Sequence, residues 1–159
     1  MADSAEESRI FAESYPALRR FAAVVGPAEC DPDDLLQEAV ARVLRRHRLD
    51  ELDHPMAYLR RTILNLASNE RRRFATRRNA LRRMAADRSD RNDDYPSDLG
   101  ELERLSAAER AVLYLSEVEG YRYAEIGQML SCSEAAARKR AMNGRRRLYS
   151  TLMEEVARG

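Results

Sequence analysis

Apolar side chains recur every three or four residues along most of this chain, which is the spacing of one face of an α-helix. In the first such segment, over residues 8–25, the spacing includes Ile10, Leu18 and Phe21. No segment of the sequence alternates apolar and polar residues in the way that a half-buried strand does. The pattern therefore predicts an all-α fold.

Two more helices follow within a first domain, for which we expect residues 1–84. Asp31 is placed to cap a helix that begins at Pro32, because proline suits the first turn and a carboxylate accepts from its free N–H groups. A third helix is expected from Met56 to beyond Arg73. The residues expected on the buried faces of these two helices are Leu35, Leu36, Ala39, Val40, Val43, Leu44, Leu59, Thr62, Ile63 and Leu66.

A second domain is expected over residues 104–159, after a polar segment rich in helix breakers, 85–103, that predicts a flexible linker. Ser106 and Glu109 have the spacing of a capping box, which marks the start of a helix. A short helix over 123–130, a tight turn and a long basic helix from Ser133 then predict a helix–turn–helix unit. The residues expected on the buried face of the long helix are Ala137, Ala141, Gly144, Leu148 and Leu152.

The net charge of +1 conceals a strongly uneven distribution. Residues 58–83 carry nine basic side chains and one acidic one, and residues 118–159 carry eight basic and five acidic ones. Residues 1–57 and 84–117 are acidic instead. Two basic blocks predict two contacts with a polyanion, and the acidic segments predict contact with a different partner.

Several function classes are excluded by composition and spacing. No run of 18 apolar residues exists, and the first apolar residues are scattered among acidic ones, so we expect neither a membrane span nor a signal peptide. Cys30 and Cys132 are far apart and have no histidine nearby, which favours reduced thiols and the cytoplasm over a disulfide or a zinc site. Asp33 and Asp34 have no third carboxylate on their helix face. We therefore expect no metal, no cofactor and no enzymatic activity.

The third helix carries polar side chains opposite its apolar stripe. Arginine suits a phosphate, and asparagine can form two hydrogen bonds with a base. The candidates for DNA contact in this helix are Arg61, Asn65, Asn69, Arg71, Arg72 and Arg73. A solvated charged face is the alternative, but such a density of like charge repels itself unless a polyanion is bound.

The long helix of the second domain has a basic outward face of its own. In a helix–turn–helix unit the second helix enters the major groove, and its N-terminal half meets the base edges. The candidates for DNA contact in this helix are Arg138, Lys139, Arg140, Met142, Asn143 and Arg146. An ordinary helical hairpin is the alternative.

Three motifs, in this order along the chain, resemble those of a known family. They are Asp33–Ala39, then Ala57–Ala67 with Arg71–Arg73, and finally Leu105–Arg110 with Glu119–Gly127. Together the chain resembles an extracytoplasmic-function (ECF) sigma factor of the bacterial sigma-70 family, the short form that keeps only regions two and four.

The resemblance implies a region-two helical bundle, a flexible linker and a region-four helix–turn–helix domain that together recognise and melt promoters as a dissociable subunit of RNA polymerase. It assigns docking on the clamp helices of the polymerase largest subunit to Asp33, Asp34, Gln37 and Glu38. It assigns the minus-ten element to residues 47–55 and to the third helix, and the minus-thirty-five element to the helix from Ser133. A contact with the polymerase flap and an anti-sigma factor are further implied partners.

Some positions depart from the family pattern. Tyr58 stands where the family usually has tryptophan, and Asn69 stands where it usually has aspartate. Residues 135–140 lack the small polar groups of the family's recognition helix, although Arg140 matches, and this predicts an unusual minus-thirty-five preference or weak reliance on that element. Two alternatives remain: a helix–turn–helix regulator that binds DNA without polymerase, and a degenerate sigma paralogue that acts only through protein contacts.

Overall fold

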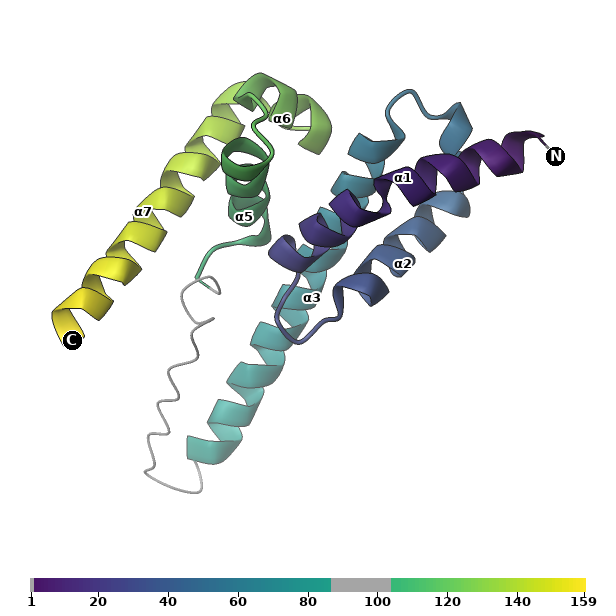
Figure 1. Cartoon of the computed structure of the whole chain (residues 1–159). Coiled ribbons are helices and arrows are strands. Elements are labelled where there is room, and N and C mark those ends of the chain that lie inside the picture. Colours follow the sequence, from purple (N-terminus) through teal and green to yellow (C-terminus); the bar gives the residue numbers. More distant parts are fainter. Residues whose placement is uncertain (1, 87–103) are drawn as a thin grey trace.

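The computed structural model describes residues 2–86 and 104–159, and this part of the chain consists of helices joined by short turns, without a strand (Figure 1). The all-α prediction is confirmed. The elements are α1 (Ala2–Val25), α2 (Pro32–Leu44), a 3₁₀ turn η1 (Leu49–Glu51), α3 (Pro55–Ala86), α5 (Ala107–Leu113), a π-helical turn η2 (Tyr114–Val118), α6 (Tyr123–Leu130) and α7 (Glu134–Arg158).

Helices α1, α2 and α3 pack against one another around a common core. The side chains of Leu18, Phe21, Leu36 and Ile63 are completely buried there. Helix α2 starts as predicted, because the Asp31 carboxylate accepts a hydrogen bond of 2.8 Å from the backbone N–H of Asp33. These three helices form a bundle of their own.

The ends of the buried stripes differ from the prediction. Leu44 is 48% exposed, because it lies in the last turn of α2, where the core side of the helix has already ended at Val43. Val40 and Thr62 are half-buried. Helix α3 continues through Ala86, so the boundary expected at residue 84 falls in its last turn. The rest of the predicted linker, 87–103, lies outside the described residues, so its flexibility stays a prediction.

The second domain begins with the predicted capping box. The Ser106 hydroxyl accepts from the N–H of Glu109 at 3.1 Å, and the Glu109 carboxylate accepts from the N–H of Ser106 at 3.3 Å. Helices α6 and α7 form the predicted helix–turn–helix, with Ser131 in the left-handed conformation (φ 55°) in its turn. The hydroxyl of Ser133 then caps α7 by accepting from the N–H of Ala136 at 3.0 Å.

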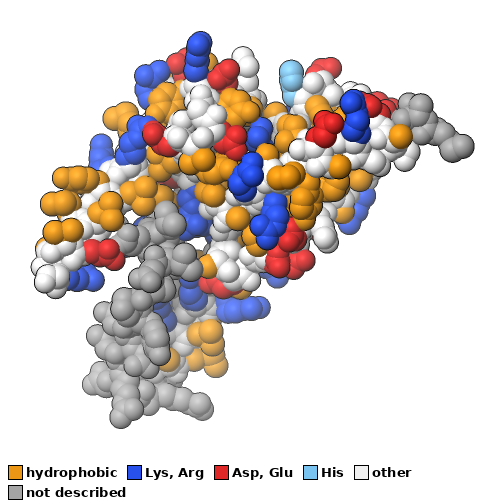
Figure 2. All heavy atoms as spheres, in the orientation of Figure 1, with side chains coloured by type: hydrophobic (Ala, Val, Ile, Leu, Met, Phe, Trp, Pro, Cys, Tyr) orange, Lys and Arg blue, Asp and Glu red, His pale blue; other side chains and the backbone are white. Residues whose placement is uncertain are grey.

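Helix α7 packs on α5 and α6, and the small side chains expected on its buried face lie in this contact. Ala137, Ala141 and Gly144 are buried, but Leu152 is 53% exposed and Thr151 is buried in its place. The prediction for Leu152 was wrong because the last turns of α7 project past the end of α5 (Figure 1). Figure 2 shows hydrophobic side chains gathered on this projecting half of α7. The exposed ones are Tyr149, Leu152, Met153 and Val156.

The two domains are packed together. Helix α5 contacts both α1 and α3, and α6 contacts α3, so the second domain sits against the side of the three-helix bundle (Figure 1). The buried residues of both domains form one continuous hydrophobic cluster. The sequence predicted two domains and a connection between them, but it did not predict this contact.

The turn between α6 and α7 folds back so closely on α6 that position 127 accommodates only glycine. A Cβ atom at Gly127 would lie 2.6 Å from the carbonyl oxygen of Cys132 and 3.3 Å from the backbone nitrogen of Glu134. These are backbone atoms, so relief requires the turn itself to shift. We expect Gly127→Ala to lower the free energy of unfolding by about 1–3 kcal/mol.

Chemical denaturation followed by circular dichroism measures this effect. The matched control is Gln128→Ala at the next, exposed position, which we expect to change stability by no more than about 0.5 kcal/mol. Equal stability of the two variants would contradict the close approach of the turn to α6.

Candidate nucleic-acid and polymerase interface

One face of α3 carries a continuous line of side chains that could meet a nucleic-acid strand. Positions separated by four, three, four and three residues lie on the same side of a helix. The members of this line, which we call the polar stripe, are Tyr58, Thr62, Asn65, Asn69 and Arg72. Asn65, Asn69 and Arg72 are exposed, and Arg73 beside them is exposed as well, with an ion pair of 3.0 Å to Glu70.

Two of the arginines predicted to contact DNA point elsewhere. The guanidinium of Arg71 donates to the carbonyl oxygens of Val25 at 2.9 Å, Leu105 at 3.1 Å and Gly26 at 3.4 Å. The guanidinium of Arg61 donates to the hydroxyl of Ser131 and lies 5.2 Å from the centre of the Tyr58 ring. Both side chains are therefore engaged within the protein in this conformation.

The segment before α3 is held in place by contacts with α1 on one side and with α3 on the other. The Glu7 carboxylate of α1 accepts from the N–H of Leu49 at 3.1 Å and lies 3.7 Å from Arg48. The His47 ring nitrogen Nε2 and the Tyr58 hydroxyl are 3.2 Å apart, and their rings meet edge to face. Within this segment, which is predicted to read the minus-ten element, His47 thus contacts the start of the polar stripe, and Arg48 and Leu49 are held by α1.

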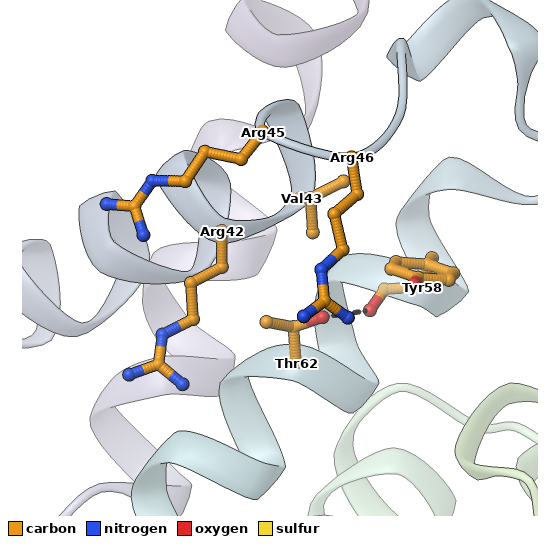
Figure 3. Close-up of a pocket in the computed structure, with 6 residues that line it drawn as sticks. All are labelled: Arg42, Val43, Arg45, Arg46, Tyr58 and Thr62. Carbon is orange, nitrogen blue, oxygen red and sulfur yellow. Dashed lines mark hydrogen bonds between the residues drawn. The ribbon is translucent and has the colours of Figure 1, made fainter.

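A hollow of about 370 Å³ opens where the end of α2 meets the start of α3 (Figure 3). Its lining residues are Arg42, Val43, Arg45, Arg46, Tyr58 and Thr62, and we call it the arginine hollow. Figure 3 shows the Arg46 side chain extending towards Tyr58 and Thr62. The Thr62 hydroxyl donates to the Tyr58 carbonyl oxygen at 2.9 Å, which fixes its orientation.

The arginine hollow combines guanidinium groups with an aromatic ring, which is the chemistry that holds the phosphates and bases of a single strand. Arg42, Arg45 and Arg46 are not among the residues expected from the sequence to contact DNA. The signal that could have identified them is the Arg45–Arg46 pair directly before the segment 47–55. The polar stripe begins at this hollow, since Tyr58 and Thr62 belong to both.

The acidic start of α2 presents the predicted polymerase-binding residues. Asp34, Gln37 and Glu38 are exposed. Asp33 instead accepts hydrogen bonds from the Tyr15 hydroxyl and from Arg19 Nε at 3.1 Å, so it is fixed to α1. The hydrogen bond from Tyr15 lowers the pKa of the Asp33 carboxyl, and the Arg42 guanidinium lowers the pKa of Glu38. Both carboxylates are therefore held in the charged form.

The outward face of α7 is only partly available. Of the predicted DNA contacts in α7, Arg138, Lys139, Met142 and Arg146 are exposed, and Arg140 and Asn143 are half-buried. Arg138 is paired with Glu134 at 2.9 Å and lies 5.3 Å from the centre of the Tyr123 ring.

Two neighbouring arginines of α7 also have partners within the domain. Arg145 is paired with Glu117 and donates to the Tyr123 hydroxyl at 3.1 Å, and the Glu117 partner raises the pKa of Arg145. Arg147 is paired with Glu109 at 2.9 Å. Arg145 and Arg147 are thus used, at least in part, for packing α7 on the rest of its domain.

Family comparisons agree with this two-domain arrangement. The family described as Sigma-70 region 2 matches residues 10–78, and the family described as Sigma-70, region 4 matches residues 100–148. Together these matches cover most of the chain. The chain belongs to the sigma-70 family. It is a sigma factor of the ECF type, which recognises promoters for transcription initiation and is not an enzyme.

A solved structure shares the fold of this sigma factor over nearly its whole length. It is the sigma factor RpoE of Bartonella quintana in complex with the anti-sigma factor NepR, with 21% sequence identity and a TM-score of 0.58. The match covers 92% of this chain and 96% of that chain. No curated protein sequence matches this chain. None of the described helices has the length and apolar character needed to cross a membrane.

The exposed side chains Gln37 and Glu38 of α2 give a test of polymerase docking. We expect the double variant Gln37→Ala, Glu38→Ala to weaken binding to core polymerase by roughly 1–4 kcal/mol if the two side chains anchor the interface. Folding should be unaffected, because both side chains are exposed. Fluorescence anisotropy of the labelled sigma factor titrated with core polymerase measures the affinity.

The control for this experiment is Glu13→Ala, which removes an exposed carboxylate from α1. We expect this variant to bind like the wild type. Equal affinities of all three proteins would contradict the assignment of Gln37 and Glu38.

Proposed function

We propose that this sigma factor opens promoter DNA by holding one exposed strand along α3, from the arginine hollow through Asn65 and Asn69 to Arg72. The observation that carries this proposal is the continuity of the polar stripe: its first two members line the hollow and its last three are open to solvent. A strand lying there would meet an aromatic ring, then two amides that can pair with base edges, then a guanidinium for phosphate.

Opening on this surface is an effect of differential binding. An extruded base costs a few kcal/mol to unstack and unpair, and contacts that exist only with the extruded base offset that cost. The Asn65 and Asn69 amides have their full effect once base edges are exposed, whereas arginines attract duplex and single strand alike. The protein therefore needs no catalytic group to favour the open promoter.

Region 4 and α2 supply the remaining contacts of the proposed holoenzyme. We assign the major-groove contact near the minus-thirty-five element to the outward face of α7, with Lys139, Met142 and Arg146 as its open side chains. We assign the contact with the polymerase clamp to Asp34, Gln37 and Glu38, and a contact with the flap to region 4. These roles place the protein in the cytoplasm with the chromosome and the polymerase.

An anti-sigma factor is a further proposed partner. The similar sigma factor of Bartonella quintana was solved together with one. In this chain a largely apolar hollow of about 650 Å³ lies between the end of α1 and the second domain, and it could accept an apolar segment of such a partner. Its apolar lining residues are Ala23, Val24, Ala28, Leu105, Leu113, Tyr114, Val118 and Leu148.

Strand opening is tested by permanganate footprinting, which detects unpaired thymines, on a promoter that the holoenzyme recognises. We expect reactive thymines with the wild type and a marked loss with Asn65→Ala, because one asparagine–base contact contributes about 1–3 kcal/mol. Binding of the holoenzyme to the closed duplex should change little. Filter binding, at a temperature below the melting transition of the promoter, measures the affinity of the holoenzyme for the closed duplex.

Asn79→Ala is the matched control, because Asn79 is an exposed asparagine of the same helix that lies beyond the polar stripe. It should give the wild-type footprint. Tight duplex binding by the protein alone, with no reactive thymines when polymerase is added, would instead support the regulator alternative. Absence of both binding and opening would support the degenerate paralogue.

A further inference from the structure

A second hollow rich in arginine lies between α3 and the second domain, and we call it the junction hollow. Its volume is about 420 Å³, within the range of about 300–1,000 Å³ that is typical of small-molecule sites. Among the described residues, Glu29, in the turn between α1 and α2, is its one acidic lining residue. Its basic lining residues are Arg71, Arg72, Arg78, Arg104 and Arg147.

The spacing of residues along α3 explains why three of these arginines line one hollow. Arg71, Ala75 and Arg78 are separated by four and three residues and share a side of the helix, and Arg72 lies beside them. The small side chain of Ala75 leaves room between the guanidinium groups. Ala108 lines the same hollow from α5 with an equally small side chain, so the space between the domains stays open.

One of the five guanidinium groups is fixed in its orientation. Arg71 donates to the carbonyl oxygens of Val25, Gly26 and Leu105, which lie in both domains. A side chain that is already held by several hydrogen bonds loses little conformational freedom when a ligand binds. Arg71 therefore supplies a preorganised positive charge at the hollow.

Other arginines of the hollow retain donors for a ligand. The Arg72 side chain is exposed and has no hydrogen bond or ion pair within the described part of the chain. Arg147 contacts Glu109 through Nη1 alone. Arg104 is paired with Glu154 at 3.3 Å, but the two side chains are 55% and 53% exposed, and such an exposed ion pair contributes little stability. Arg104 can therefore exchange this partner for a bound anion.

The charge of the hollow indicates the chemistry of its ligand. Guanidinium groups bind phosphate oxygens with paired N–H donors. Five cations against one carboxylate favour an anion with several charges, and their placement on three separate segments favours an anion whose charges are spread along a short chain. A polyphosphate meets both conditions, and the volume of the hollow suits a small molecule.

From these observations we propose that the junction hollow is a binding site for a small polyphosphate anion, either inorganic or the polyphosphate group of a nucleotide. Binding is a property of the free chain and needs neither DNA nor polymerase. Glu29, which is paired with Arg78 at 3.5 Å, opposes it. Because Arg72 also ends the polar stripe, a bound polyphosphate would occupy a guanidinium that we assign to DNA, and this consequence alone rests on the proposed function.

Isothermal titration calorimetry of the full chain tests the site, with sodium triphosphate as the probe, at constant ionic strength and without divalent metal ions. We expect one saturable site, with triphosphate bound at least about tenfold more tightly than orthophosphate. Arg72→Gln with Arg104→Gln should weaken triphosphate binding at least about tenfold. Glu29→Gln removes the opposing carboxylate and should strengthen the binding about threefold.

Two control variants make the same changes of charge away from the hollow. Arg82→Gln with Arg83→Gln removes two exposed arginines from the end of α3, and Glu13→Gln removes an exposed carboxylate from α1. Both should bind triphosphate like the wild type. All the substituted side chains are exposed, so we expect every variant to fold, and circular dichroism checks this.

ATP and GTP, titrated under the same conditions, distinguish the two sources of the polyphosphate. Tighter binding than that of triphosphate would identify a nucleotide as the ligand, and equal or weaker binding would identify inorganic polyphosphate. The proposal is overturned by a lack of saturable triphosphate binding, by equal affinity for orthophosphate, or by equal effects of the Arg72–Arg104 and Arg82–Arg83 variants. None of these results affects strand opening by the holoenzyme, and a failure of the permanganate test would leave the measured affinity intact.

Discussion

The packing of the two domains against each other depends on the carbonyl groups at the end of α1. A helix leaves its last carbonyls without partners in its own backbone, and a cation nearby also complements the negative end of the helix dipole. Here Arg71 of α3 and Arg110 of α5 satisfy three consecutive carbonyls, those of Val24, Val25 and Gly26. Because one arginine comes from each domain, the end of α1 joins the three-helix bundle to region 4.

That junction explains why α3 has more than one buried side. The expected core stripe of Leu59, Ile63 and Leu66 faces α1 and α2, as an amphipathic helix of a small bundle would. A second buried face of α3, which contacts α5 and α6, adds Leu64 and Ala67, placed between Arg60 and Arg71. Those two apolar residues are the signal in the sequence for a second packing surface, but flanked by arginines they are easily taken for part of a solvated face.

The sequence predicts most strongly what depends on neighbours along the chain. The cap at Asp31, the capping box at Ser106 and the short helix Tyr123–Leu130 are set by local hydrogen bonds and spacing, and all three are present in the structure. The roles of Arg46 and Arg71 depend instead on which helix ends meet in space. Arg46 lines a hollow because the end of α2 meets the start of α3, and Arg71 is occupied because α1 and Leu105 converge on it.

The candidate DNA-contacting side chains of α3 and α7 differ in whether they already have partners within the protein, and this difference suggests different roles for the two helices. In α7, Arg138, Arg145 and Arg147 each have an acidic partner within region 4, and the small residues near its start offer few groups for base edges. In α3, Asn65 and Asn69 are exposed on a stripe that begins in the arginine hollow. An amide can form two hydrogen bonds with adenine and a guanidinium two with guanine, but a guanidinium already paired with a carboxylate has fewer donors left for a base. We therefore infer that α3 carries most of the sequence discrimination, and that α7 contributes mainly affinity and position on the duplex.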